Sequence, residues 1–100
     1  MSKPFFIEAL ERGDPALLGQ MISLQEFVGR EGALSVKTKT LMSLLVDAVL
    51  GHAEGVRALA ERARSQGATE PEITETVRMA FFCGGMPALV TGTSAFRPRS

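Results

Sequence analysis

The sequence predicts an all-α domain of about six helices, with a hairpin of the third and fourth helices at its centre. Two observations lead to this fold class. Residue types that cap helix N-termini stand within a few residues of the start of apolar segments, at Asp14, Ser35 and Thr69. Between these points apolar residues recur at intervals of three and four, which is the period of a helix. No segment shows the pattern of a strand.

Two helices are predicted near the N-terminus. The first spans Pro4 to Arg12 and is stopped by Gly13. Asp14 caps the second helix, and Pro15 suits its first turn because the φ of proline is already helical. This helix extends to about residue 28. One side of it carries Leu17, Met21, Leu24 and Val28.

The third helix begins after Ser35 and reaches about Leu50, where Gly51 ends it. It is apolar almost all round, so we expect it to be buried on most sides. Its polar exceptions share one narrow stripe, because they are spaced at i, i+3 and i+7. They are Thr40, Ser43 and Asp47. Polar groups on a buried helix need partners, so the stripe predicts a polar pocket.

The fourth helix is predicted from Ala53 to Gln66, and Gly67 follows as a left-handed C-cap. The side chains expected to be buried are Val56, Leu59, Ala60 and Ala63. Those expected to face away are Glu54, Arg57, Glu61 and Arg64.

Thr69 and Glu72 have the spacing of a capping box, which starts a fifth helix. Its predicted buried side consists of Ile73, Val77, Ala80 and Phe81. Gly84 and Gly85 break this helix, and a short final helix follows from Met86 to Phe96. We expect the last four residues to be frayed.

Composition restricts the classes of function. The chain has 100 residues, enough for one domain, and a formal net charge of zero. Zero charge argues against nucleic acid and anionic membranes as partners, and the absence of Trp and Tyr weakens base stacking. We see neither a signal peptide nor a membrane span. A single cysteine fits the cytoplasm. The helices are more apolar than a small monomer needs, which predicts self-association.

Three segments together resemble one protein family. They are Lys37–Leu41, then Gly67-Ala68-Thr69 with Glu72-Ile73, then Gly85–Ala88. In this order and spacing they resemble the carboxymuconolactone decarboxylase and alkylhydroperoxidase D-like family, most strongly over residues 34–96. The resemblance implies a single domain over residues 1–100, an antiparallel helical bundle. It also implies assembly as a homo-oligomer, a trimer or hexamer, with pockets near the subunit contacts.

The resemblance also implies where a redox site would lie. Redox members carry a Cys-x-x-Cys-x-x-x-His motif at the start of the helix that ends in Gly-Ala-Thr. Those positions correspond here to His52, Gly55 and Leu59, and a glutamate of the same site corresponds to Thr40. The two thiols, the histidine and the acid are therefore absent at these positions. The decarboxylase branch keeps the histidine, which is Leu59 here, and leucine transfers no proton.

His52 with Asp47 is the predicted catalytic pair. Imidazole titrates near neutral pH and so suits acid–base chemistry, and a neighbouring carboxylate can orient it. Thr40, Ser43 and Arg57 are the predicted substrate-binding residues. The alternative is structural: Asp47 and His52 satisfy helix ends or bond across a subunit boundary. Arg57, Arg62 and Arg64 could bind an anionic substrate, and their alternative is a solvated helix face.

Cys83 offers a different chemistry, that of a thiol peroxidase or reductase. Its alternative is a small buried hydrophobe packed beside Phe81 and Phe82, because the C-terminal end of a helix disfavours a thiolate. One histidine and scattered carboxylates give no metal site, and no cofactor is expected. Three functions remain open: binding of, or acid–base chemistry on, a small organic acid or lactone; thiol chemistry at Cys83; and a non-catalytic oligomeric scaffold.

Overall fold

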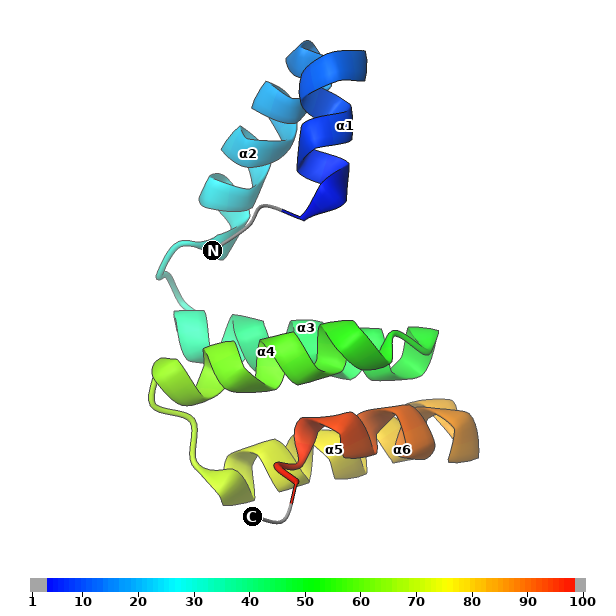
Figure 1. Cartoon of the computed structure of the whole chain (residues 1–100). Coiled ribbons are helices and arrows are strands. Elements are labelled where there is room, and N and C mark those ends of the chain that lie inside the picture. Colours follow the sequence, from blue (N-terminus) through cyan, green and yellow to red (C-terminus); the bar gives the residue numbers. More distant parts are fainter. Residues whose placement is uncertain (1–3, 99–100) are drawn as a thin grey trace. The chain divides into compact units, whose positions relative to one another are not determined.

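The computed structural model describes residues 4–98, and these form helices and no strand. The prediction of an all-α fold is confirmed (Figure 1). The helices are α1 (Phe5–Gly13), α2 (Pro15–Gly29), α3 (Val36–Leu50), α4 (Ala53–Ser65), α5 (Glu70–Gly84), α6 (Met86–Gly92) and the 3₁₀ helix η1 (Thr93–Ala95). They divide into two compact units, Met1–Glu31 and Gly32–Ser100.

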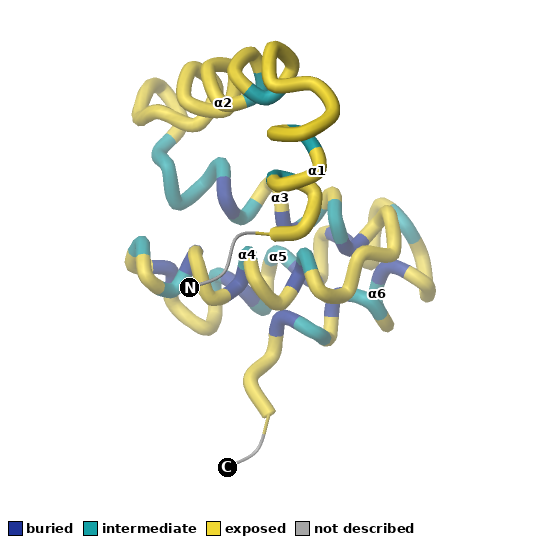
Figure 2. Tube along the Cα trace, turned by 45° about the horizontal axis from the view of Figure 1, so that its top comes forward, coloured by how far each residue is buried: buried dark blue, intermediate teal, exposed yellow. Residues whose placement is uncertain are grey.

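The first unit is the hairpin of α1 and α2, which contact each other. The Asp14 carboxylate accepts a hydrogen bond from the Leu17 N–H at 3.0 Å, so the predicted cap of α2 is confirmed. Neither helix contains a buried residue, as Figure 2 shows for α2. Leu17 and Leu24, from the predicted apolar side, are 52% and 61% exposed.

The second unit is built on the hairpin of α3 and α4. Helices α5 and α6 pack against α3, and η1 packs against α4 (Figure 1). The buried side chains come from these elements and form one core. Most of them are alanines, and the largest fully buried side chains are Leu44, Ile73 and Val56. Because small residues let the helices approach one another closely, little space is left between them, and a few large side chains are enough to fill it.

The predicted helix ends of this unit are confirmed. The Ser35 hydroxyl accepts a hydrogen bond from the Thr38 N–H at 3.0 Å, which caps α3. Thr69 and Glu72 form both hydrogen bonds of the capping box at the start of α5. Gly67 has a φ of 95°, a value that favours glycine because a Cβ would be strained there.

Helix α3 is less covered than its apolar sequence predicts. Its buried residues are Thr40, Leu44 and Ala48, which share one side of the helix. The opposite side is open, and its exposed apolar side chains are Met42, Val46, Val49 and Leu50. Within the unit Gly32–Ser100 the prediction of burial on most sides is therefore wrong, because α4, α5 and α6 together cover one side of α3.

One burial prediction and one predicted helix end are wrong in the C-terminal half. Ile73, Val77 and Ala80 are buried as predicted, but Phe81 is 44% exposed because it lies at the margin of the helix side that these three residues form. The final helix is shorter than predicted: α6 ends at Gly92, and the tighter η1 follows it.

Arg64 was predicted to face away, but its side chain is only 8% exposed. Its guanidinium donates two hydrogen bonds to Glu70, at 2.7 and 2.9 Å, and one to Glu61 at 2.9 Å. A further one goes to the backbone carbonyl of Ala95 at 2.8 Å. Arg97 also donates two hydrogen bonds to Glu61. These contacts tie α4, the start of α5 and η1 together, which explains why a charged side chain is buried there.

No helix within residues 4–98 combines the length and the hydropathy that crossing a bilayer requires.

Candidate functional site

The turn between α3 and α4 places His52 directly before the first residue of α4. Gly51 has a φ of 84°, which ends α3 in the left-handed conformation. The N–H of Gly51 donates to the Ala48 carbonyl at 3.2 Å, and the N–H of His52 donates to the Asp47 carbonyl at 2.8 Å. These two bonds close the C-terminus of α3. They also fix the backbone of His52 relative to Asp47.

The side chains of His52 and Asp47 meet at this turn. His52 Nδ1 lies 3.3 Å from Asp47 Oδ1. The imidazole is 62% exposed, whereas the Asp47 side chain is 26% exposed. An Nδ1–H bond to the carboxylate leaves Nε2 as the ring nitrogen that can accept a proton. The structure therefore brings together the two residues predicted as a catalytic pair, with the imidazole accessible.

The other two residues of the predicted polar stripe have partners within their own helix. The Thr40 hydroxyl donates to the Val36 carbonyl at 3.1 Å, and the Ser43 hydroxyl donates to the Lys39 carbonyl at 3.1 Å. Thr40 is 7% exposed. Backbone carbonyls satisfy both hydroxyls, so neither one requires a polar pocket.

Arg57, the predicted anion-binding residue, lies in the first turns of α4. Its Nη1 donates to Glu54 Oε1 at 2.6 Å, and both side chains are largely exposed. An exposed pair of this kind contributes little to stability, so its guanidinium can exchange partners. Arg57 is thus on the helix that begins at His52, and it is accessible from solvent.

Cys83 lies in the last turn of α5, a helix that does not form the α3–α4 turn. Its side chain is exposed. The neighbouring Phe82 is 83% exposed. The alternative that made Cys83 a small buried residue packed beside Phe81 and Phe82 is therefore wrong for a single copy, because Phe82 and Cys83 lie off the side of α5 that Ile73, Val77 and Ala80 turn toward the core.

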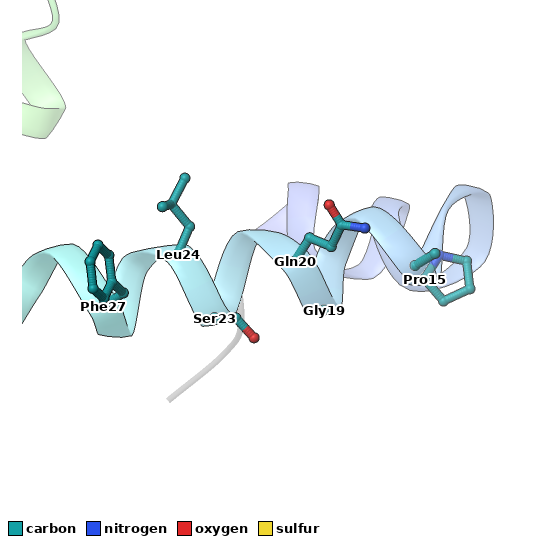
Figure 3. A pocket seen from close by; sticks show the side chains of 7 residues that line it. Pro15, Gly19, Gln20, Ser23, Leu24 and Phe27 are labelled. Carbon is teal, nitrogen blue, oxygen red and sulfur yellow. The ribbon is translucent and has the colours of Figure 1, made fainter.

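Two shallow hollows of the surface lie elsewhere. One, of about 680 Å³, is lined by seven residues of α2 alone, from Pro15 to Phe27 (Figure 3). The other, of about 530 Å³, lies over the start of α5 and includes Glu70 and Arg78. Each is lined by residues of a single helix, and neither lining includes His52 or Asp47. Over residues 4–98 no three His, Cys, Asp or Glu side chains gather as metal ligands.

Sequence reasoning missed one contact of this site. A Cβ built on Gly55 would overlap Asp47 Oδ2 and lie 3.0 Å from Asp47 Cγ. The carboxylate thus occupies the space that a side chain at position 55 would take. The glycine itself was the available signal, because glycine inside a helix is unfavourable without a packing reason.

Comparisons with known proteins agree on one family. The model of the carboxymuconolactone decarboxylase family matches residues 15–98. The structure is similar to the crystal structure of the apo form of a carboxymuconolactone decarboxylase family protein from Legionella pneumophila. The TM-score is 0.82 and the sequence identity 25%, over 91% of this chain and 81% of that one. No curated protein sequence matches the chain.

Proposed function

Because the chain belongs to the carboxymuconolactone decarboxylase family, we propose that it binds a small organic acid or lactone at the α3–α4 turn. His52 exchanges a proton with the bound molecule, and Asp47 orients the imidazole. The observation that supports this proposal is the 3.3 Å approach of Asp47 Oδ1 to His52 Nδ1 beside an exposed ring. A carboxylate on one ring nitrogen prepares the other nitrogen for acid–base work.

The thiol chemistry of the redox branch does not fit this turn. Position 52 carries an imidazole, and position 55 carries no side chain. Leu59, at the position of the family histidine, is a partly buried side chain packed against the core. In this proposal His52 therefore takes the place of the family histidine as the imidazole that transfers a proton.

Arg57 supplies the group that recognises an acidic ligand in this proposal. A guanidinium binds a carboxylate through two parallel hydrogen bonds, a geometry that its present contact with Glu54 does not use. The exposure of the pair lets a ligand carboxylate take the place of Glu54. Arg57 and His52 would then hold the two ends of a small molecule.

Self-association completes the proposal. The unit Gly32–Ser100 by itself leaves an apolar side of α3 uncovered, formed by Met42, Val46, Val49 and Leu50. Water contact with such a surface is unfavourable, and a second copy that covers it removes the cost. Leu50 is two residues from His52 in the sequence. A neighbouring copy that covers this side of α3 would therefore also cover the α3–α4 turn and enclose a ligand bound there. We expect a homo-oligomer, a trimer or hexamer as the family resemblance implies.

An exposed Cys83 supports a rival function, thiol-dependent reduction of peroxides. Accessibility is the first requirement for a reactive thiol. The rival makes Cys83 necessary and His52 dispensable, so one set of variants separates the two functions. A non-catalytic scaffold makes both residues dispensable.

The test compares His52→Ala with Cys83→Ser in a calorimetric titration against a panel of small lactones and dicarboxylates. We expect the wild type to bind one class, and His52→Ala to weaken that binding by at least about tenfold, which equals about 1.4 kcal/mol. Cys83→Ser should bind as the wild type does. Unchanged binding in His52→Ala contradicts the proposal, and peroxide consumption that is lost only in Cys83→Ser establishes the rival.

A further inference from the structure

We infer that Gly55 is a positioning residue for His52: its missing side chain makes the space from which Asp47 fixes the tautomer of the imidazole. The inference builds on the proposed role of His52. Three residues support it: His52 and Gly55, one turn apart at the start of α4, and Asp47, near the end of α3. The Asp47 carboxylate lies between the imidazole and the α4 backbone, with Oδ1 toward His52 and Oδ2 toward Gly55.

The contact at Gly55 determines where the carboxylate can be. Real Cβ atoms essentially never come as close to another atom as a Cβ at position 55 would come to Oδ2. Any side chain there would displace the carboxylate. The displaced group is the end of a flexible side chain, so Asp47 can rotate away while both helices stay in place. The expected consequence of filling position 55 is therefore loss of the contact with His52, not unfolding.

The start of α4 favours a carboxylate at this place. The first N–H groups of a helix have no partner within it and carry partial positive charge. The His52 side chain forms no hydrogen bond that caps the helix, and two carboxylates lie close to this end: Glu54 in the first turn and Asp47 beside Gly55. The dipole of α4 thus favours a carboxylate beside Gly55, where Asp47 Oδ1 is 3.3 Å from His52 Nδ1.

Orientation of the ring has a chemical consequence. While Oδ1 accepts from Nδ1–H, the neutral imidazole carries its lone pair on Nε2, which becomes the base. Without the carboxylate, nothing in the turn selects this tautomer. Gly55 therefore acts on His52 through Asp47 and needs no contact with the ligand.

The ring nitrogens of His52 report the tautomer directly, because it is the sole histidine of the chain. In ¹⁵N NMR of the folded protein above pH 8, a protonated and an unprotonated ring nitrogen give well-separated signals. We expect the wild type to show a protonated Nδ1. Asp47→Ala and Gly55→Ala should each lose this preference and give similar spectra, and the double variant should give the spectrum of Asp47→Ala.

Two controls separate positioning from general disturbance. Asp47→Asn keeps the size of the side chain, but its amide can present either the oxygen or the NH₂ group to Nδ1, so it should weaken the preference for a protonated Nδ1 without changing the packing. Gly19→Ala fills a helical glycine of α2 where a Cβ meets nothing within 4 Å, so it should leave the His52 signals unchanged. A Gly55→Ala spectrum identical to that of the wild type would overturn the inference, and so would a wild type with Nδ1 unprotonated. Since these spectra need no ligand, they can hold even if the proposed ligand binding fails.

Discussion

Leu44→Ala is expected to lower the free energy of unfolding by about 3 kcal/mol, the typical cost of removing a fully buried leucine. Leu44 has no exposed surface, and it is one of three large fully buried side chains in a core made mostly of alanine. Alanines cannot expand into the vacated space, so most of the cavity should persist. Urea unfolding followed by circular dichroism, at one fixed protein concentration, measures the effect.

The matched control for this prediction is Leu24→Ala. It removes the same atoms from α2, where Leu24 is 61% exposed. We expect its effect to be within about 1 kcal/mol of the wild type, because little buried apolar surface is lost. A Leu44→Ala protein no less stable than Leu24→Ala would show that the core of Gly32–Ser100 is packed differently.

Arg64→Ala is expected to have the second-largest effect, a loss of about 2–3 kcal/mol. The substitution removes hydrogen bonds to Glu61, to Glu70 and to the Ala95 carbonyl. It also leaves that carbonyl without its donor. Arg62→Ala, an exposed arginine two residues earlier on α4, is the control and should change stability little. Equal effects of the two substitutions would contradict the structural role of Arg64.

The Arg64 effect should also depend on pH. The hydrogen bond from Arg64 is the main cause that holds the pKa of Glu70 below its ordinary value of 4.5. A carboxylate with a lowered folded pKa contributes stability above its unfolded pKa, and this is lost as the pH falls through the folded pKa. We therefore expect the difference between wild type and Arg64→Ala to be full at pH 7. It should shrink as the pH is lowered below about 4.5, whereas a difference that grows with acid would contradict the account.

The ends of the helices could be predicted from the sequence because the causes are local. A cap needs one side chain and a backbone N–H three residues away, as at Ser35 and Thr69, and a left-handed glycine needs only its own backbone. The faces that pack together could not be predicted in the same way. The sequence of α3 is apolar on almost every side, so its periodicity does not indicate which side is covered. The burial of Arg64 could not be predicted either, because its partners lie six and 31 residues away in the sequence and no local pattern points to them.

The same distinction between local and non-local causes applies to the candidate site. His52 and Asp47 are five residues apart across one turn, so their meeting followed from the predicted helix end. Their contact with Gly55 depends on how closely α4 approaches α3, which a single sequence does not specify. Thr40 and Ser43 share the stripe with Asp47, yet the hydroxyl of each was free to bond its own helix instead. Whether Arg57 and these hydroxyls serve a ligand remains a prediction.

A ligand site built on His52 is tested most directly by an electron-density map of the assembled protein crystallised with the lactone or dicarboxylate that it binds best. We expect the turn to border a hollow shared between two copies of the chain. Density for the ligand should lie within hydrogen-bonding distance of His52 Nε2. A turn packed dry against a neighbouring copy, or ligand density bound away from His52, would contradict the proposed function.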